Sequence, residues 1–436
     1  MTTVFRRSAL AFALATTLAG CGALPGMPVA SQLRGAEGFA ALADVNEIDA
    51  QIKANAIGMD EFGFQVKKLP APTKAKPVTF FTFKALDNNL GMVLPQHLNT
   101  LEKAGSNTNV NAVVLADDVG PNNTRLYYIK QDTDANKISS PWQKAGRDGE
   151  MNTGSGVALG AAMRWAFGTY PSKTRWLDVN NHGGGYYGIA QDDNADSIIR
   201  LPQLGKALAR GNGGQKLDLL TFDACLMATA EVAYELRDAA KVMVASEDSS
   251  YALGMNYDAT LAALAQKPTT DADDLGRDLV MRAQRKGKTV ALFTLSAIDL
   301  TKADRVAGAV DGLGKALMGA LPRQKAVIKQ SLGAVKAFYV AGPDKSDFNH
   351  RDLNEVCDQL RVRVQDPAVQ AACQAVKATL FNKNGAILVS RSAHEEGKTA
   401  RGLSVYLPTD GTVDPIYKDT AFAKATSWDE FLAALK

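Results

Sequence analysis

The sequence lacks several features that identify particular classes of protein. Its 49 lysine and arginine residues are nearly balanced by 46 aspartate and glutamate residues, so the net charge is only +3. It contains no basic block and no basic stripe interleaved with aromatic residues. Because nucleic acid binding depends on such a basic surface, we do not expect a nucleic acid partner. No internal repeat is apparent either.

Cysteine and histidine are also scarce, with four residues of each among 436. They do not occur with Asp and Glu at the spacing of zinc ligands, so the sequence does not predict a zinc site. One acidic segment, Asp192-Asp193-Asn194-Ala195-Asp196, could bind calcium through its oxygen atoms. We interpret this segment as a solvated loop and expect no cofactor, with calcium as the alternative.

The N-terminal residues carry an apolar run that points to export. Arg6 and Arg7 precede an apolar stretch from Ala9 to Leu18, which is too short to cross a bilayer as a mature helix. Positive charge followed by a short apolar stretch is typical of a secretory signal peptide. The stretch ends in Leu18-Ala19-Gly20-Cys21, which resembles a bacterial lipobox, in which the cysteine becomes the lipidated first residue.

These residues predict an exported protein that is lipid-anchored to the bacterial membrane, in the periplasm or at the cell surface. The alternative is an ordinary signal peptide that is cut near Ala30, in which case Cys21 carries no lipid. No second long apolar run follows, so we expect the lipid on Cys21 to be the only attachment to the membrane.

From residue 78 onward, β-prone and helical segments alternate. Continuous apolar runs such as Val78-Thr79-Phe80-Phe81-Thr82-Phe83 are typical of strands that are buried on both faces. We expect strands at 78–83, 110–116, 124–131, 175–180, 217–222 and 242–246, and helices at 95–103, 157–168, 201–210 and 226–239. This alternation predicts an α/β fold, a mostly parallel sheet with helices on both faces.

The pattern changes near residue 270, where longer helical segments begin. Together with strand candidates at 289–295, 386–389 and 403–407, they predict a C-terminal α+β lobe. The domain prediction is therefore a lipoprotein signal peptide at 1–20, a tether at 21–76 with one short helix near 40–56, a catalytic α/β domain at 77–270 and the C-terminal lobe at 271–436.

Two of the expected strands end in unusual residues. The strand at 175–180 is followed by Asn181-His182-Gly183-Gly184-Gly185, and the strand at 217–222 is followed by Asp223-Ala224-Cys225. Sites in open parallel sheets lie just beyond the carboxyl ends of the strands. His182 and Cys225 are therefore the candidate catalytic residues.

The chemistry of these two residues suits a nucleophile and its base. At the start of the expected helix 226–239, the Cys225 thiol would be stabilised as a thiolate by the helix dipole. His182 would act as general base toward the thiol and as general acid toward the leaving amine. The backbone amides of Gly183 and Cys225 are candidates to bind the developing oxyanion.

Each of these features also has an ordinary structural interpretation. A His-Gly-Gly-Gly segment alone is a turn signal, and a single cysteine is more often a buried core residue. Their occurrence at two neighbouring strand ends is what favours catalysis. We interpret the other histidines, His97, His350 and His394, as ordinary surface or second-lobe residues. Cys357 and Cys373 lie close together in an exported chain and are predicted to form a possible disulfide.

At these residues the sequence resembles the clostripain family of cysteine peptidases, relatives of the caspases and gingipains. The resemblance covers residues 78 to 436, and its most specific part is Phe222-Asp223-Ala224-Cys225-Leu226-Met227. Other similar segments are Asp87-Asn88-Asn89-Leu90, Asp148-Gly149-Glu150-Met151-Asn152, His182-Gly183-Gly184-Gly185, Ala245-Ser246-Glu247-Asp248 and Ala400-Arg401-Gly402-Leu403-Ser404-Val405-Tyr406. Residues 249–257 depart from the family, which often has Pro-Gly-x-Gly-Trp there.

The resemblance implies a caspase-like fold and a Cys-His dyad that needs no third member. It implies an endopeptidase that acts through a thioester acyl-enzyme and cuts after Arg or Lys, with protein or peptide substrates as partners. His182 would be the general base and acid, Cys225 the nucleophile, and Asp223 a carboxylate near the S1 pocket. A helix N-cap is the structural alternative for Asp223. Asp248, or Glu247 beside it, could supply a second carboxylate.

Two other functions remain as alternatives. The first is a non-catalytic lipoprotein of the cell surface that keeps the caspase-like fold as a binding module. The presence of both His182 and Cys225 argues against it. The second is an unrelated Cys-His acyltransferase, which the acidic Asp223 beside the nucleophile makes less attractive.

Overall fold

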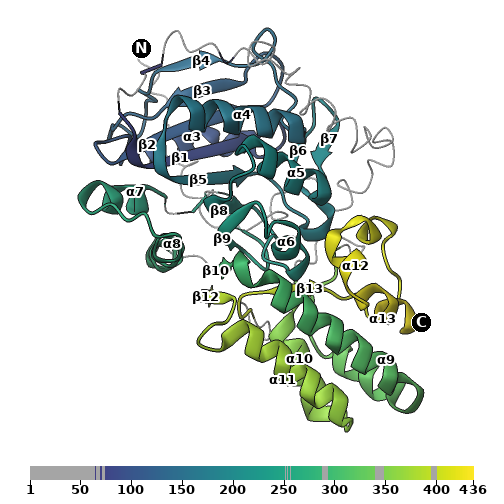
Figure 1. Ribbon diagram of the computed structural model, residues 1–436. Helices are drawn as coiled ribbons and strands as arrows, with labels where there is room; N and C mark the ends of the chain where they lie inside the picture. Colours follow the sequence, from purple (N-terminus) through teal and green to yellow (C-terminus); the bar gives the residue numbers. More distant parts are fainter. Residues whose placement is uncertain are drawn as a thin grey trace, which may run out of the picture.

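The computed structural model describes residues 64, 69–70, 74–250, 252, 254–255, 257–286, 293–338, 348–393 and 400–436. The predicted signal peptide, the lipidation candidate Cys21, the short helix expected near 40–56 and His394 lie outside these residues. Of the helices that are described, none is both long and apolar enough to cross a membrane. Figure 1 shows an α/β domain in the upper part of the view and a helical lobe below it.

A nine-stranded sheet forms the centre of the described structure, with the strand order β12-β10-β9-β8-β5-β1-β2-β3-β4. The strands are β1 (Lys76–Ala85), β2 (Val110–Asp117), β3 (Arg125–Tyr128), β4 (Trp142–Lys144), β5 (Ser172–Asn180), β8 (Leu217–Asp223), β9 (Ala240–Ala245), β10 (Phe293–Asp299) and β12 (Ile387–Ala393). Strands β2, β1, β5, β8 and β9 run parallel, and the outer strands are antiparallel to their neighbours. The prediction of a mostly parallel α/β sheet is confirmed.

Helices cover both faces of this sheet because its strands are apolar on both sides. Along β1, Phe81 and Phe83 pack into one core, and Val78 and Phe80 pack into the other. The first core includes α4 (Gly156–Thr169), α5 (Leu201–Gly211) and α6 (Ala230–Glu235), and the second includes α3 (Leu94–Glu102), α7 (Tyr257–Gln266) and α8 (Ala272–Lys286). The carboxyl ends of the parallel strands are thereby left at one edge, between the two helical layers.

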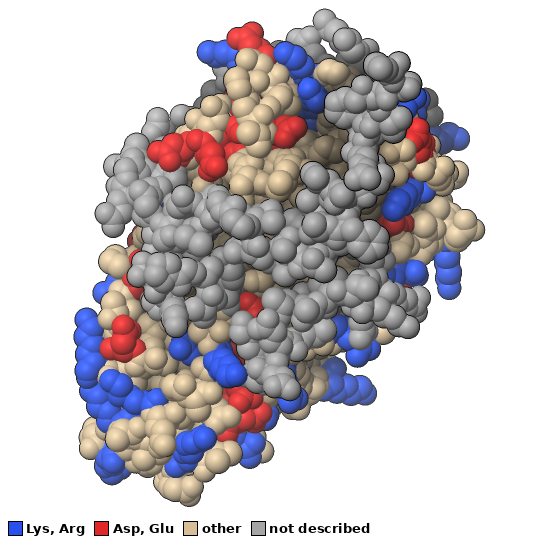
Figure 2. Space-filling view, turned by 180° about the vertical axis from the view of Figure 1, so that it is seen from behind, with Lys and Arg blue, Asp and Glu red and all other residues tan. Residues whose placement is uncertain are grey.

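The C-terminal part of the chain joins the same sheet. Strands β10 and β12 extend it beyond β9, and α9 (Ala303–Gly333), α10 (Leu353–Arg363) and α11 (Pro367–Phe381) pack beside one another below it (Figure 1). A short pair, β11 (His350–Asp352) and β13 (Ser404–Tyr406), precedes η4 (Pro415–Asp419), α12 (Ala421–Ala425) and α13 (Trp428–Ala434). Figure 2 shows basic and acidic side chains interspersed over this helical part, as the nearly balanced net charge suggests.

The structure differs most from the predicted elements directly after β8. Helix α6 spans Ala230–Glu235 and not the expected 226–239. Leu226 has a φ of 62°, in the left-handed region, which a continuous α-helix does not allow. The Thr229 side chain caps α6 by accepting a hydrogen bond from the Val232 amide at 3.1 Å. The chain therefore becomes helical only at Ala230, five residues after Cys225.

Residues 226–228 are held by partners from other segments instead of by a helical turn. The Leu226 amide donates to the Asp248 carbonyl at 3.2 Å, and the Ala228 amide donates to the Ser246 carbonyl at 2.8 Å. Both partners follow β9, the neighbour of β8 in the sheet. The expected effect of a helix dipole on the Cys225 thiol is therefore wrong.

Candidate active site

Strands β5 and β8 bring His182 and Cys225 to the same edge of the sheet. The strands are parallel neighbours in which Asn180 lies opposite Asp223, and His182 and Cys225 each follow two residues later. Both side chains are buried, with 6% and 1% of their surface exposed. A Cβ atom at Gly183 would lie 2.4 Å from the Cys225 carbonyl oxygen, so the two loops touch and only glycine fits there.

The His182 ring is oriented by Asn89, which follows β1. The distance between His182 Nε2 and Asn89 Oδ1 is 2.7 Å. Because the amide oxygen only accepts hydrogen bonds, Nε2 carries the proton and Nδ1 is left as the basic atom. Burial lowers the pKa of His182 to about 4, so the imidazole is neutral at physiological pH. A neutral ring is the form that a general base requires.

Asn89 is a site residue that sequence reasoning did not identify, although its segment was recognised as similar to the family. The rule that pointed to His182 and Cys225 also applies to β1, because Asn89 follows the end of that parallel strand. Asn181 is a second such residue. Its Oδ1 accepts hydrogen bonds from the amides of His182 and Gln191, and its Nδ2 donates to the Ala85 carbonyl, which ties the His182 loop to the end of β1.

The Cys225 sulfur accepts a hydrogen bond from the Ser250 amide at 3.2 Å. This backbone donor takes the place of the helix dipole as a group that favours the thiolate.

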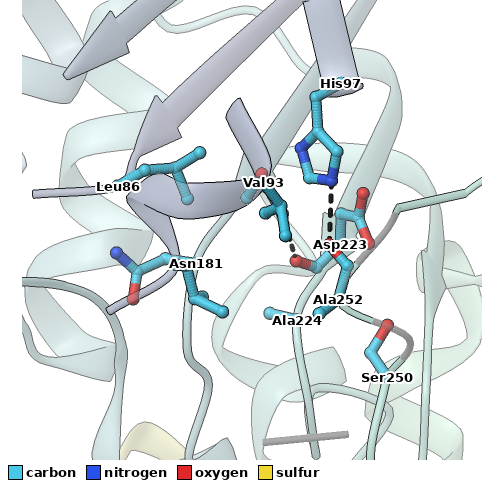
Figure 3. A pocket seen from close by; sticks show the side chains of 10 residues that line it. Leu86, Val93, His97, Asn181, Asp223, Ala224, Ser250 and Ala252 are labelled. Carbon is cyan, nitrogen blue, oxygen red and sulfur yellow. Dashed lines mark hydrogen bonds between the residues drawn. The ribbon is translucent and has the colours of Figure 1, made fainter. Parts of the chain in front are cut away.

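A small pocket adjoins the two loops. Asp223 and Ala224, which precede Cys225, form one wall, and the remaining lining residues are Leu86, Leu90, Val93, His97, Asn180, Asn181, Ser250 and Ala252. In Figure 3, Asp223 lies below His97, close to Ala252. Asp223 is thus the one carboxylate among apolar and uncharged polar lining residues, a setting that suits a side chain ending in a cation.

Two contacts fix Asp223 in this pocket. Its Oδ2 accepts a hydrogen bond from the Met255 amide at 3.2 Å, and its carbonyl accepts one from Asn180 Nδ2 at 2.8 Å. The alternative role as a helix N-cap is wrong, because Thr229 caps the helix that follows. Asp248 does not line the pocket; its Oδ1 accepts from the Ser249 amide at 2.8 Å.

His97 lines the same pocket, so its interpretation as an ordinary surface residue is wrong. It is buried, with Nε2 2.8 Å from the Ala252 carbonyl and Nδ1 3.3 Å from Lys84 Nζ. A neutral ring protonated at Nε2 satisfies both contacts, since Nδ1 then accepts from the lysine. His97 therefore links α3 to the chain segment that contacts Cys225. Burial lowers the pKa of Lys84.

His350 lies in the second lobe, as predicted, but it packs against the His182 loop. It is fully buried, and a Cβ atom at Gly185 would lie 2.5 Å from its Cε1 and Nε2 atoms. Neither ring nitrogen has a hydrogen-bond partner among the described residues. Burial lowers the pKa of His350 to about 3, so the ring is neutral. The side chain therefore acts as a packing surface for Gly185.

Asp87, Asp117 and Glu150 form a group of carboxylates with the geometry of a cation site. One oxygen from each lies within 4.8 Å of the others. Asp87 Oδ2 is buried and lacks a hydrogen-bond partner among the described residues. Burial raises the pKa of Asp117 to about 8 and that of Asp87 to about 6. Two buried carboxylates and one half-buried carboxylate, with an unused oxygen atom on Asp87, fit a hard divalent cation such as calcium.

The segment 192–196, considered for calcium from sequence, plays a different part. Residues 193–196 form an exposed turn between β6 (Ile189–Asp192) and β7 (Ser197–Ile199), as predicted for a solvated loop. Asp192 itself is buried and accepts hydrogen bonds from the amides of Thr153 and Ala195, both at 2.8 Å. Its oxygens are thus already used within the chain.

Cys357 and Cys373 face each other across α10 and α11. Both are buried free thiols in this structure, so the disulfide considered from sequence is not formed in it. A hydrogen bond with Cys373 and burial raise the pKa of Cys357 well above its ordinary value. Because the two side chains are already in contact, the disulfide remains a prediction for the oxidised protein.

Comparison with known proteins places these residues in a family. The sequence matches the clostripain family over residues 82–434. It is 24% identical over 453 residues to clostripain from Hathewaya histolytica, a match that covers 85% of this chain and 83% of clostripain.

Solved structures show the same fold. A secreted C11 cysteine protease from Bacteroides thetaiotaomicron, in complex with an irreversible peptide inhibitor, has a TM-score of 0.61 at 18% identity and covers 81% of this chain and 100% of its own. An inactive zymogen C11 protease from Parabacteroides distasonis has the same TM-score and identity, covering 81% and 99%. Since the family match extends over most of the sequence, the chain belongs to the clostripain family of cysteine peptidases.

Proposed function

We propose that this peptidase is an endopeptidase whose nucleophile is Cys225 and whose general base is His182. The observation that carries the proposal is the register of β5 and β8, which brings both residues to one edge of the sheet. Nδ1 of His182 takes the proton of the reduced Cys225 thiol, and the thiolate attacks the scissile carbonyl carbon. The negative charge that develops on the carbonyl oxygen is bound by the amides of Gly183 and Cys225.

The tetrahedral intermediate then collapses to a thioester. The C–N bond breaks, and the protonated His182 gives its proton to the leaving amine. Water, deprotonated by the same imidazole, attacks the thioester and releases the acid and the Cys225 thiol. The hydrogen bond between His182 Nε2 and Asn89 supports this cycle because it keeps Nδ1 available for each proton transfer.

Cleavage after Arg, and less efficiently after Lys, is the specificity that we propose. Asp223 supports it, since it is the one acidic residue among those described as lining the pocket and lies two residues before the proposed nucleophile. A guanidinium pairs with a carboxylate through two parallel hydrogen bonds, whereas a lysine ammonium meets it as a point charge. Asp248 lies outside the lining of this pocket, so Asp223 is the carboxylate to test first.

The experiment compares dipeptide amides with Arg, Lys, Asp or Leu at P1, using reduced mature protein and its Cys225→Ala variant. Hydrolysis of the Arg amide by the wild type alone is the expected result. An equal rate in both proteins would end the assignment of Cys225. A non-catalytic binding module would hydrolyse none of the four, and an acyltransferase would consume them only with an added amine or alcohol acceptor.

Asp223→Asn tests the pocket separately from the chemistry. It should lower kcat/KM for the Arg amide much more than for the Leu amide, because only the first pairs with the carboxylate. Asp248→Asn is the matched control and should not change this ratio. Equal losses on both amides in Asp223→Asn would mean that the basic preference has another source.

We also infer export with a lipid on Cys21, which rests on Leu18-Ala19-Gly20-Cys21 after a short apolar run. The relative from Bacteroides thetaiotaomicron is described as secreted, which supports the export part. Mass spectrometry of protein expressed in a bacterial host should find the acyl mass on Cys21. A mature chain that begins elsewhere, for example at Ser31, would refute the lipid anchor.

A further inference from the structure

Two buried carboxyl groups meet between the end of β9 and the start of α10. They belong to Glu247 and Asp352, both almost fully buried. Glu247 Oε2 accepts a hydrogen bond from the Gly402 amide at 2.6 Å, and Asp352 Oδ2 accepts one from the adjacent Arg401 amide at 2.7 Å. Asp352 Oδ1 caps α10 by accepting from the Glu355 amide at 2.6 Å.

The two side chains are also within hydrogen-bonding distance of each other. Two ionised carboxylates offer only acceptors, so a hydrogen bond between them requires one proton. Glu247 Oε1 is the oxygen that lacks any other partner among the described residues. The proton therefore fits on Glu247, whose O–H would donate to the Asp352 carboxylate.

Within the described residues, the surroundings of the pair add negative charge and no paired positive charge. In the part of the chain that the structure describes, no ion pair reaches either carboxyl group. The charged side chains that act on the pair are acidic: Asp248 on Glu247 and Glu355 on Asp352. Both carboxyl groups can be buried together only if one of them is neutral.

We propose that Glu247 and Asp352 share one proton and that this acid–carboxylate pair positions the segment that carries Cys225. This proposal rests on the function proposed above. Glu247 lies between Ser246 and Asp248, whose carbonyls bind the Ala228 and Leu226 amides. The pair fixes one side of the nucleophile segment through these neighbours.

The other side of the same segment is fixed through residues 401–404. The Ser404 amide donates to the Ala228 carbonyl at 2.9 Å, and Ser296 Oγ donates to the Gly402 carbonyl at 2.7 Å. Residues 226–228 therefore lie between two segments, 246–248 and 401–404, which the Glu247–Asp352 pair holds together. Loss of the shared proton would leave two negatively charged carboxylates in contact, and their repulsion would push the two segments apart. Glu247 and Asp352 are thus positioning residues and touch no reacting atom.

The sign of the pH dependence follows from the direction of the pKa shifts. Burial raises the pKa of Glu247 well above its ordinary value, and burial raises the pKa of Asp352 to about 6. The folded protein then holds a proton that the unfolded chain has already released. Stability therefore falls as the pH rises from the ordinary glutamate range through the raised pKa of the pair.

Two substitutions at Glu247 separate the shared proton from simple packing. Glu247→Gln keeps an oxygen that accepts from the Gly402 amide and adds an amide that donates to Asp352 at every pH. Glu247→Leu has a similar volume and offers neither bond. We expect Glu247→Gln to retain activity at pH 7, and Glu247→Leu to lose on the order of 100-fold in kcat/KM, because small displacements of a nucleophile have such effects.

The decisive measurement is the ratio between Glu247→Gln and wild type across pH. The titrations of Cys225 and His182 affect the pH profiles of both proteins in the same way, so they cancel in the ratio of kcat/KM. That ratio, and the difference in Tm, should rise with pH in favour of Glu247→Gln. Ratios that are flat with pH would overturn the shared proton, as would a Glu247→Gln protein as inactive at pH 7 as Glu247→Leu.

A readout that is independent of turnover keeps this test separate from the proposed function. The rate of Cys225 alkylation by iodoacetamide, located by mass spectrometry in reduced protein, reports the nucleophile without any peptide substrate. It should fall in Glu247→Leu and be preserved in Glu247→Gln. If the wild type hydrolyses no peptide but this pattern holds, the peptidase chemistry fails and the positioning pair stands. An unchanged alkylation rate in Glu247→Leu would overturn the positioning role.

Discussion

The loops that carry His182 and Cys225 both contain residues in the left-handed backbone conformation, but the residue types differ. After β5, the left-handed conformations fall on Gly185, with φ of 60°, Gly188, with φ of 136°, and Ala190, with φ of 65°. After β8, the left-handed residue is Leu226, with φ of 62°. Glycine adopts this region without a steric penalty, whereas leucine does so at a cost of about 1–2 kcal/mol. Two of the three left-handed residues in the His182 loop are thus glycines, whereas the one in the Cys225 loop is a leucine.

Partners elsewhere in the chain hold the Cys225 loop in its conformation. Backbone hydrogen bonds join residues 226 and 228 to the segment after β9 and to Ser404. Strained backbone at a functional site persists only where the surrounding structure determines it in this way. The proposed nucleophile therefore depends on parts of the molecule that are far from it in sequence.

The largest expected effect comes from testing whether the two loops form one catalytic unit. Cys225→Ala and His182→Ala should each lower kcat by a factor on the order of 1,000 or more, because neither group acts without the other. The double variant should be no slower than the slower single variant. The measurement is steady-state hydrolysis of an Arg amide by reduced protein, with circular dichroism spectra to show that each variant is folded. A double variant far slower than both single variants would mean that the residues act independently.

A smaller effect is expected at Asn89, which supports the His182 loop from β1. Asn89→Ala leaves the buried Nε2–H of His182 without its acceptor, at a cost of about 1–3 kcal/mol. We expect kcat to fall about 10- to 100-fold with little change in KM, since the substrate pocket is not altered. Asn136→Ala, at an exposed position in the 131–137 loop, is the matched control. An Asn89→Ala enzyme with wild-type kcat would show that His182 needs no such orientation.

The difference between the two loops also explains what could be predicted from the sequence. The parallel strands and His182 at its strand end were predictable, because apolar periodicity and glycine positions are local signals. The helix expected at 226–239 was wrong because the amides of Leu226 and Ala228 bond to the segment after β9, and no local pattern records those partners. Asn89, His97 and the Glu247–Asp352 pair were missed for the same reason. Their roles arise only when strand ends distant in sequence meet.

Gly185 offers a direct test of local encoding in the His182 loop. Gly185→Ala places a Cβ atom 2.5 Å from the His350 ring at a residue with φ of 60°. We expect a loss of about 1–3 kcal/mol in the free energy of unfolding, measured with urea. Gly168→Ala in α4 is the control, since nothing lies within 4 Å of its added Cβ atom. If both variants have the stability of the wild type, the loop does not require glycine at 185.

The smallest expected effect concerns the carboxylates behind Asn89. Asp87 lies two residues before Asn89, so a cation bound by Asp87, Asp117 and Glu150 would stabilise the side of the site that orients His182. Calcium at ten times its Kd should raise the free energy of unfolding by about 1.4 kcal/mol, which thermal unfolding at several calcium concentrations would detect. Because cation binding displaces protons from carboxyl groups with pKa values of about 6 and about 8, the stabilisation should be larger at pH 8 than at pH 6.

Two variants decide where any bound calcium lies. Asp87→Asn removes the charge of the carboxyl group whose Oδ2 has no described partner, and it should abolish the response to calcium. It should also stabilise the protein without calcium, because it lowers the repulsion between buried carboxylates. Asp196→Asn changes an exposed residue of the turn after β6 and should leave the response intact. If Asp196→Asn abolishes the response to calcium and Asp87→Asn does not, calcium binds at the 192–196 segment. If both variants respond like the wild type, calcium binds at neither position. In either case the His182 loop would owe its order to glycines and to Asn89 and Asn181 alone.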